Sequence, residues 1–331
     1  MKFVITDYIE DNLDYEQDVA DQLGIDFAYH QLKTASQEDL LEAVDGAEVI
    51  LVNMVPFTAE VIDQLENCRM ILRHGIGYDN VDVEAATRAG IAVANYPTYC
   101  TRDVAEQAVM LMMACQRKLP LQLKLLDQSV KAQKWIFEDI YPVYRMAAQT
   151  IGIIGFGRIG STVYRMLSGF GVDFLINDPY LSEQRVKEYG IELHSFEEVI
   201  SRADIITIHC PLKWEETHHM FDRPQFDLMP EQAILINTAR GGIVNLVALD
   251  QALKEGKLAG AGIDVYEQEP PSKELSILKN PKAICTPHLS WLSEEAGWDI
   301  RKDYLDDVKR FLERKPPKNV LNPDVEIKYL R

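Results

Sequence analysis

The chain has few cysteines, and they form no pattern that would hold a metal ion or a disulfide framework. There are five, an odd number, with no CxxC pair among them: Cys68, Cys100, Cys115, Cys210 and Cys285. Cysteines used in this way are typical of small buried side chains in a reducing compartment. We therefore expect a cytoplasmic protein without a metal site.

Positive charge and long apolar runs are also scarce. The 331 residues include 34 Lys and Arg against 52 Asp and Glu, which gives a formal net charge of −18. Nucleic acid and anionic membrane surfaces repel such a chain at long range, so neither is an expected direct partner. No stretch approaches the apolar length of a membrane span, and residues 1–6 lack the apolar region of an export signal, so export is not expected.

The chain does contain short β-branched runs that alternate with amphipathic segments. In the N-terminal part, the expected strands are 3–6, 48–53, 70–73 and 91–94, with helices over 36–44 and 59–65. A second series contains six expected strands: 151–154, 174–177, 205–209, 233–237, 260–265 and 283–286. This alternation predicts an α/β protein with two doubly wound parallel-sheet domains. Six strands is the full count of a Rossmann dinucleotide-binding fold.

A glycine fingerprint, Gly-Phe-Gly-Arg-Ile-Gly over residues 155–160, directly follows the first strand of the second series. Gly155 permits a tight turn, Gly157 lets a pyrophosphate approach the backbone, and Gly160 lets the next helix pack close to the sheet. The N-terminus of that helix supplies N–H groups and a positive dipole end for phosphates. Asp178 ends the next strand, where its carboxylate can bind the adenosine ribose and repel a 2′-phosphate. The pattern predicts NAD as cofactor in preference to NADP.

Two helical patterns indicate how the domains are arranged along the chain. One covers residues 101–119, with Thr101 as the expected N-cap, and separates the two strand series. The other begins after Ser293, its expected N-cap, and runs to about Lys315. If that last helix packs on the first sheet, the second domain is inserted into the first. We expect a flavodoxin-like substrate domain over 1–101 and 291–331, and a Rossmann domain over 102–290.

The segment 123–146 lacks strand alternation and contains Trp135, Phe137, Tyr141 and Tyr144. An aromatic segment outside both sheets is either a dimerisation arm or a stretch that packs on its own domain. The sequence leaves both readings open.

Three polar side chains follow the last three strands of the second series: Arg240, Glu269 and His288. A guanidinium binds a carboxylate with two hydrogen bonds and polarises an adjacent carbonyl. A histidine beside a carboxylate is held in one orientation and can give a proton to a carbonyl oxygen. Open α/β sheets bind ligands at the carboxyl ends of their strands, so these three are candidate catalytic residues, and Glu269 is expected to meet His288.

These motifs together resemble the D-isomer-specific 2-hydroxyacid dehydrogenase family over almost the whole chain. The matching stretches, in family order, are 73–82, 104–108, 155–160, 237–242, 264–270 and 286–288. The resemblance implies catalysis by the three residues above, an inserted dinucleotide domain and a homodimer. With the reasoning above, it assigns NAD contacts to Val104, Gly155, Phe156, Gly157, Arg158, Ile159, Asp178, His209, Cys210, Pro211, Thr217, Thr238, Ala239, Arg240 and Asp264. It assigns substrate contacts to Ile76, Gly77, Tyr99, Arg240, His288 and Trp291.

Within the family, the stretches 178–181, 217–219 and 284–288 resemble the C-terminal-binding-protein subgroup, whose members include corepressors that retain a dehydrogenase fold. His218 and His219 are adjacent, and no acidic or cysteine partner has ligand spacing, so a helix-cap or surface role is expected rather than a metal site. His209 either lines the adenosine pocket or satisfies a backbone group, and His74 is expected to be structural.

Two functions are compatible with these residues. One is NAD-dependent reduction of a 2-oxo acid to a D-2-hydroxy acid, with His288 as proton donor. The other is an NAD(H)-sensing dimeric scaffold with little turnover, as the corepressor resemblance suggests. The complete catalytic set favours the enzyme, and Glu269 disfavours formate oxidation because formate dehydrogenase relatives have glutamine there. Phosphoglycerate oxidation stays open.

Aromatic walls at Tyr99 and Trp291 would suit a bulky substrate, although Trp291 could instead pack the domain junction.

Overall fold

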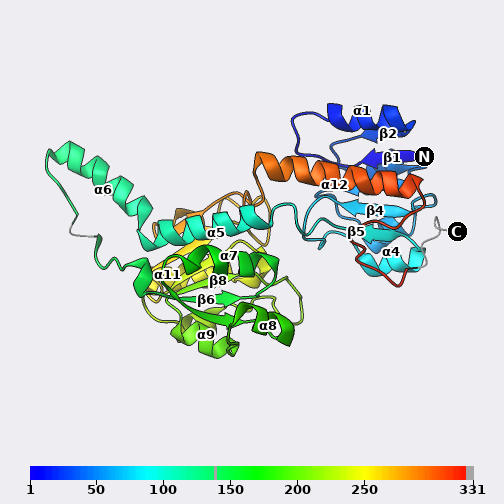
Figure 1. Cartoon of the computed structure of the whole chain (residues 1–331). Coiled ribbons are helices and arrows are strands. Elements are labelled where there is room, and N and C mark those ends of the chain that lie inside the picture. The colour runs from blue at the N-terminus through cyan, green and yellow to red at the C-terminus, as the bar shows by residue number, and fades with distance from the viewer. Residues whose placement is uncertain (138–139, 326–331) are drawn as a thin grey trace. The chain divides into compact units, whose positions relative to one another are not determined.

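Two parallel α/β sheets organise the computed structural model, which describes residues 1–137 and 140–325 (Figure 1). The internal contacts divide the chain into two units. Unit 1 combines Met1–Cys100 with the stretch from Ser293 on, and unit 2 comprises Thr101–Leu292. Both units have the expected fold class, with helices packed on a wholly parallel sheet. None of the described helices is long and apolar enough to cross a membrane.

Unit 1 contains a sheet of five strands in the order β2-β1-β3-β4-β5. The strands are β1 (Lys2–Ile5), β2 (Asp26–Tyr29), β3 (Val49–Val52), β4 (Met70–Arg73) and β5 (Ala92–Ala94), and its helices are α1 (Asp14–Leu23), α2 (Gln37–Val44), α3 (Ala59–Ile62), α4 (Val83–Ala89) and α12 (Glu294–Leu312). The central strand β3 is buried at every position, as a parallel strand covered on both faces requires. Strand β2 was not expected, because its sequence Asp-Phe-Ala-Tyr has no β-branched residue and lies at the sheet edge.

Helix α12 joins the C-terminal stretch to the first sheet. Ile300 and Tyr304 lie in the same buried cluster as Phe3 and other residues of β1 and β3. Ser293 is the N-cap, as expected, and its hydroxyl accepts a hydrogen bond from the Ala296 amide at 3.0 Å. The helix ends at Leu312, earlier than expected, because Arg314 has a left-handed φ of 55°.

Unit 2 contains a six-stranded sheet in the order β11-β10-β9-β8-β6-β7. All six expected strands are present: β6 (Thr150–Ile154), β7 (Asp173–Asn177), β8 (Ile205–Ile208), β9 (Ile234–Asn237), β10 (Gly260–Ile263) and β11 (Ala283–Cys285). The helices are α5 (Thr101–Gln116), α6 (Leu119–Ala132), α7 (Arg158–Ser168), α8 (Glu183–Tyr189), α9 (Phe196–Arg202), α10 (Arg223–Leu228) and α11 (Leu246–Glu255), with short 3-10 turns η2 (Met146–Ala148), η3 (Gly241–Ile243) and η4 (Ser276–Lys279).

Both sheets reverse their strand order at the corresponding place. The reversal lies between β1 and β3 in unit 1 and between β6 and β8 in unit 2. Connections leave these neighbouring strands in opposite directions, which opens a crevice at their carboxyl ends where doubly wound folds bind ligands. The loops after these four strands are therefore the candidate ligand-binding loops.

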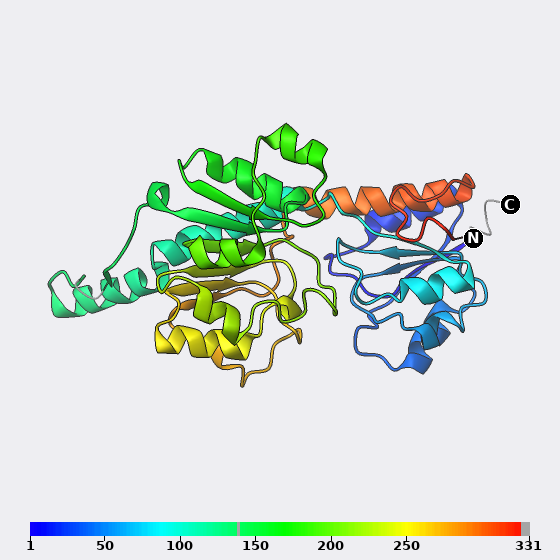
Figure 2. The same cartoon turned by 90° about the horizontal axis from the view of Figure 1, so that it is seen from below.

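Helix α5 ends at Gln116, three residues before the end of the helix expected over 101–119, and α6 was not expected. Helix α5 begins at Thr101, so this residue is the first helical residue and not the N-cap. The chain then turns at Lys118, which has a left-handed φ of 51°. Helix α6 buries Leu125 but exposes Leu123 and Val130 by 62% and 61%. In both views α6 extends away from the sheet of its own unit (Figures 1 and 2).

Candidate cofactor and active site

The glycine loop lies at the strand-order reversal of unit 2. Gly155 has a φ of +89°, and a Cβ atom there would lie 2.7 Å from the amide nitrogen of Cys210. A Cβ atom on Gly160 would lie 2.1 Å from the carbonyl oxygen of Gly155. Both distances are too short for real atoms, so these two glycines allow the loop after β6 to fit between α7 and the loop after β8.

Gly157 has different surroundings, and they test whether a dinucleotide fits here. A Cβ atom on Gly157 would meet nothing within 4 Å, and no side chain caps the N-terminus of α7 that begins after it. Two buried polar atoms at the carboxyl ends of β8 and β9, His209 Nδ1 and Thr238 Oγ1, have no hydrogen-bond partner in the described part of the chain. Uncapped N–H groups facing open space, together with unsatisfied buried polar atoms, fit the pyrophosphate and polar groups of NAD.

Asp178 is fixed at the end of β7 by its neighbours. Its Oδ2 accepts a hydrogen bond from the Phe156 amide at 2.8 Å, and its Oδ1 accepts one from the Tyr180 amide at 3.0 Å. This places a carboxylate beside the glycine loop, where the fold binds the adenosine ribose. The Phe156 side chain is fully buried against the rings of Tyr164 and Tyr189, so only its backbone is available to a cofactor.

The loop after β8 forms the other side of this region. Burial, with a smaller contribution from the charge of Asp178, raises the pKa of Cys210 to about 12. Burial also lowers the pKa of His209 to about 3, so its ring is neutral and hydrogen-bonds to Thr207 Oγ1 at 2.9 Å. Its partner is therefore a side chain and not the backbone group considered above. The hydroxyl of Thr217 holds the loop by donating to the Pro211 carbonyl at 2.8 Å.

His288 and Glu269 meet as expected. His288 Nδ1 lies 2.6 Å from Glu269 Oε2, and Glu269 Oε1 accepts a hydrogen bond from the Tyr266 amide at 2.9 Å. Burial acts to raise the pKa of Glu269, but the hydrogen bond and charge of His288 outweigh it, and the pKa is lowered. The carboxylate stays ionised and fixes the imidazole through Nδ1. That leaves Nε2 as the nitrogen available for a substrate.

Asp264 holds the loop that carries His288, a role that the sequence did not reveal. Its side chain is fully buried, and its Oδ1 accepts hydrogen bonds from the Thr286 hydroxyl and, at 3.2 Å, from the Leu289 amide. Its Oδ2 accepts from the amide of Ser290 at 2.9 Å and from the hydroxyl of the same residue. His288 has a left-handed φ of 55°, so the loop needs such support. The expected contact of Asp264 with the nicotinamide stays a prediction.

Arg240 follows β9 at the same edge of the sheet. Its carbonyl accepts a hydrogen bond from Asn237 Nδ2 at 2.9 Å. A Cβ atom on Gly241 would lie 1.9 Å from the carbonyl carbon of Tyr266, so the loop after β9 lies against the loop after β10. The charge of Arg240 is also among the causes that lower the pKa of Glu269. The structure therefore brings the three candidate catalytic residues to one edge.

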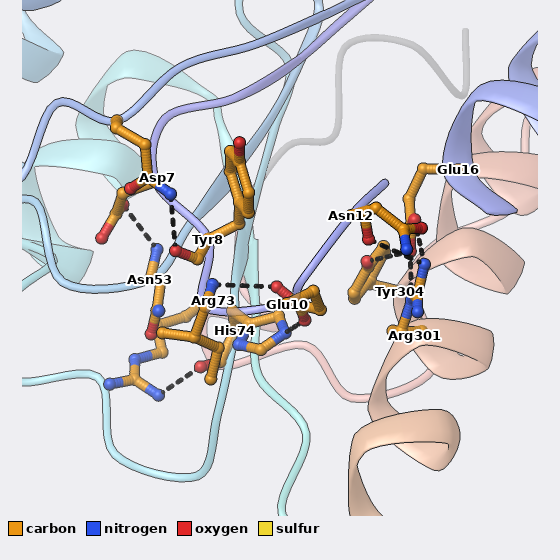
Figure 3. A network of polar contacts seen from close by, with 12 residues as sticks. Asp7, Tyr8, Glu10, Asn12, Glu16, Asn53, Arg73, His74, Arg301 and Tyr304 are labelled. Carbon is orange, nitrogen blue, oxygen red and sulfur yellow. Dashed lines mark hydrogen bonds and ion pairs between the residues drawn. The ribbon is translucent and has the colours of Figure 1, made fainter. Parts of the chain in front are cut away.

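At the strand-order reversal of unit 1, the side chain of an aspartate binds the backbone of the neighbouring loop (Figure 3). Asp7 follows β1 and is 3% exposed. Its Oδ1 accepts a hydrogen bond from the Asn53 amide at 3.1 Å, and its Oδ2 accepts one from the Met54 amide at 2.7 Å. The amides after β3 are thus satisfied by a side chain of the protein itself.

The loop after β4 contains the expected substrate contacts Ile76 and Gly77, and two side chains that the sequence did not reveal shape its start. Glu10 Oε1 lies 3.0 Å from Nε2 of the buried His74 (Figure 3). Burial acts to raise the pKa of Glu10, but the hydrogen bond and charge of His74 lower it to about 2. Arg73 Nη1 donates to the His74 carbonyl at 2.7 Å. His74 is structural here, as expected.

The remaining predicted residues have simpler settings. Val104 is buried in α5, Tyr99 packs against the core cluster of unit 1, and Trp291 is partly exposed at the end of unit 2. His219 lies 2.6 Å from Glu267 and does not cap a helix, because the next helix has Asp222 as its N-cap. Over 1–137 and 140–325, no three His, Cys, Asp or Glu side chains gather as a metal site would require.

Comparisons with known proteins agree with this geometry. Residues 109–290 match the family model described as "D-isomer specific 2-hydroxyacid dehydrogenase, NAD binding domain". A D-3-phosphoglycerate dehydrogenase of Archaeoglobus fulgidus is 36% identical over 89% of this chain and 56% of its own length. A glyoxylate reductase of Korarchaeum cryptofilum is 35% identical over 88% of this chain and 87% of its own. The chain spans about half the length of the phosphoglycerate dehydrogenases that it matches.

Among solved structures, a D-lactate dehydrogenase from Aquifex aeolicus complexed with NAD and lactic acid superposes with a TM-score of 0.83 and 26% identity, covering 96% of this chain and 98% of the other. These matches do not single out the C-terminal-binding-protein subgroup, so that finer resemblance stays a prediction. The chain belongs to the D-isomer-specific 2-hydroxyacid dehydrogenase family, and the match to its NAD-binding domain lies within unit 2.

Proposed function

We propose that this protein is an NAD-dependent dehydrogenase that reduces a 2-oxo acid to the D-2-hydroxy acid. The observation that carries the proposal is the His288–Glu269 pair, joined at 2.6 Å at the sheet edge that also carries Arg240 and the glycine loop. A nucleotide-binding scaffold needs the glycine loop and Asp178 but has no use for an oriented imidazole beside an ionised carboxylate.

Each residue has a distinct part in the proposed reaction. Arg240 binds the substrate carboxylate through its guanidinium and polarises the adjacent carbonyl, and the backbone at Ile76 and Gly77 is a further proposed carboxylate contact. NADH supplies the hydride that adds to the carbonyl carbon. His288 gives the proton from Nε2 to the carbonyl oxygen, and Glu269 stabilises the protonated ring before the transfer. The carbonyl carbon thus receives the hydride and the carbonyl oxygen receives the proton, which gives the hydroxyl of the product.

The test replaces the proton donor and measures chemistry and binding separately. His288→Asn should lower kcat for 2-oxo acid reduction by about a hundredfold or more while the NADH dissociation constant stays within about twofold. Arg240→Lys should also be severe, because a point charge cannot replace a two-pronged carboxylate contact. If the wild type turns over no member of a broad 2-oxo acid panel although it binds NADH, the enzyme proposal fails and the scaffold takes its place.

The panel of 2-oxo acids also tests which substrate the protein prefers. The relatives are named for phosphoglycerate, glyoxylate and lactate, so hydroxypyruvate, its 3-phosphate, glyoxylate and pyruvate belong in it. Tyr99 and Trp291 are the proposed side-chain contacts, which would favour bulky 2-oxo acids. Trp291→Ala should then reduce kcat/KM for phenylpyruvate and 4-methylthio-2-oxobutyrate much more than for pyruvate. An equal loss for all three would assign Trp291 to packing alone.

We also propose that α6 and the residues after it form a homodimer contact. Leu123, Leu126 and Val130 of α6 and Trp135 beyond it are 62%, 51%, 61% and 75% exposed, and large apolar side chains exposed along one segment are typical of a protein contact. Leu126→Asp with Val130→Asp should convert a dimer to a monomer in light scattering. A monomeric wild type would contradict the proposal.

A further inference from the structure

Three side chains join the loops after β7 and β8, just beyond Asp178. Tyr180 is tied to Asp178 through its amide, and its hydroxyl donates to Glu216 Oε2 at 2.5 Å. Lys213 Nζ lies 3.1 Å from both Glu216 oxygens and 4.3 Å from the centroid of the Tyr180 ring. The lysine is thus held between a carboxylate and an aromatic face. We call Tyr180, Lys213 and Glu216 the adenosine-edge cluster.

The cluster contains a basic residue that sequence inspection near Asp178 does not reveal. No Lys or Arg immediately follows Asp178, where an NADP-binding protein would carry a cation for the 2′-phosphate. Lys213 comes from the neighbouring loop and reaches the ring of the residue two positions after Asp178. An unpaired ammonium here would attract a 2′-phosphate and offset the repulsion from Asp178.

Glu216 removes that attraction. The hydrogen bond of Glu216 raises the pKa of Lys213, and the Tyr180 hydroxyl and then Lys213 lower the pKa of Glu216, so both stay charged and paired. The side chains are 43% and 46% exposed, and an exposed pair of this kind contributes little to folding stability. Its effect is on the local electrostatic field instead, because the charge of Glu216 compensates the charge of Lys213.

We propose that Glu216 is a second determinant of selectivity for NAD over NADP, acting through Lys213. The proposal rests on Asp178 binding the adenosine ribose, as inferred above. Asp178 repels the 2′-phosphate directly. Glu216 pairs with Lys213, the one cation of the cluster, which would otherwise attract the phosphate. Selectivity is thereby built from two loops and not from Asp178 alone.

The experiment measures dissociation constants of NADH and NADPH by fluorescence titration at low ionic strength. Glu216→Gln should tighten NADPH binding by about five- to tenfold and leave NADH binding within about twofold, because Lys213 becomes free to meet the phosphate. Glu215→Gln is the matched control: it removes the same charge from the neighbouring exposed position outside the cluster, and it should change NADPH binding by less than about twofold.

The double variant Glu216→Gln with Lys213→Met should lose the gain, since the proposal assigns it to Lys213. An equal effect of the Glu215 and Glu216 variants, or a gain that survives the loss of Lys213, overturns the proposal. The titration requires no 2-oxo acid, so absence of turnover would count against the proposed reaction without affecting this result. Circular dichroism of each variant checks that the fold is intact.

Discussion

The strand-order reversals of the two units have the same topology and opposite chemistry. In unit 1, the amides of Asn53 and Met54 after β3 donate to the carboxylate of Asp7 from the loop after β1. In unit 2, the loop after β6 is glycine-rich, the N-terminus of α7 has no side-chain cap, and open space surrounds Gly157. In unit 1 a carboxylate of the protein satisfies both amides, whereas in unit 2 the N-terminus of α7 is left for a ligand.

This difference shows that strand order provides a crevice but does not decide what fills it. Numbered within each sheet, the strand order is 2-1-3-4-5 in unit 1 and 2-1-3-4-5-6 in unit 2, so topology alone would assign a ligand site to each. The residues after the strands decide: in unit 1 Asp7 satisfies the amides after β3. In unit 2 Asp178 accepts from the Phe156 amide of the glycine loop, whereas Gly157 leaves the start of α7 open. Unit 1 uses the loop after β4 for its proposed substrate contacts instead.

The largest expected effect comes from altering the glycine loop at the strand-order reversal of unit 2. Gly157→Ala adds a methyl group that meets no protein atom within 4 Å but enters the space proposed for the pyrophosphate. NADH affinity should fall by about a hundredfold, near 3 kcal/mol, while the melting temperature hardly changes. Titration and calorimetry on one sample measure both.

Gly155→Ala is the contrasting variant. Its Cβ would lie 2.7 Å from the Cys210 amide nitrogen, and the φ of +89° is unfavourable for alanine, so folding itself should suffer. If the two variants lose stability equally, the space beside Gly157 is not open, and the contrast between the reversals fails.

The next largest effect concerns the strand-order reversal of unit 1, where Asp7 satisfies the loop amides. Asp7→Ala leaves the amides of Asn53 and Met54 without their acceptor, which should cost about 2 to 4 kcal/mol of unfolding free energy. NADH affinity in unit 2 should stay within about twofold. Urea unfolding measures the first quantity and titration the second. Addition of acetate should restore part of the stability if the carboxylate acts as a built-in anion; no restoration would mean that Asp7 serves only packing.

The third effect is a pH dependence that Glu10 contributes in unit 1. The pKa of Glu10 is lowered from 4.5 to about 2, so its contribution to stability is present above pH 4.5 and is lost as the pH falls towards 2. The shift corresponds to at most about 3 kcal/mol. Glu10→Gln should therefore be less stable than wild type at pH 6 and lose less stability on acidification. Glu42→Gln, on the exposed side of α2, should follow the wild-type curve.

Much of the site was predictable, because its residues are marked by chemistry and by position. All six strands of unit 2 and the contact of Glu269 with His288 followed from polar residues placed after apolar runs, since parallel strands end at one edge. The contacts that support the site were not predictable. Glu10 meets His74 across 64 positions and Tyr180 meets Glu216 across 36, and nothing local marks either pair.

Those pairs become visible only when the sheet order is known, because they join loops that are neighbours in space and distant in sequence. Edge strand β2 was missed for a related reason: half exposed and without β-branched residues, it is held by its pairing with β1 and not by its own propensity. Sequence identifies the groups that act, whereas the partners that orient them depend on tertiary structure.

The smallest expected effect concerns Asp264, the buried aspartate of unit 2 that supports the loop after β11. Ser290→Ala removes one of the four donors to the buried Asp264 and leaves His288 and Glu269 intact. The loop after β11 should then hold His288 less firmly, and kcat should fall by about tenfold, near 1.4 kcal/mol, with NADH affinity unchanged. A loss of NADH affinity with unchanged kcat would instead place Ser290 and Asp264 at the cofactor. Steady-state kinetics on the best 2-oxo acid, with a parallel NADH titration, separates the two outcomes.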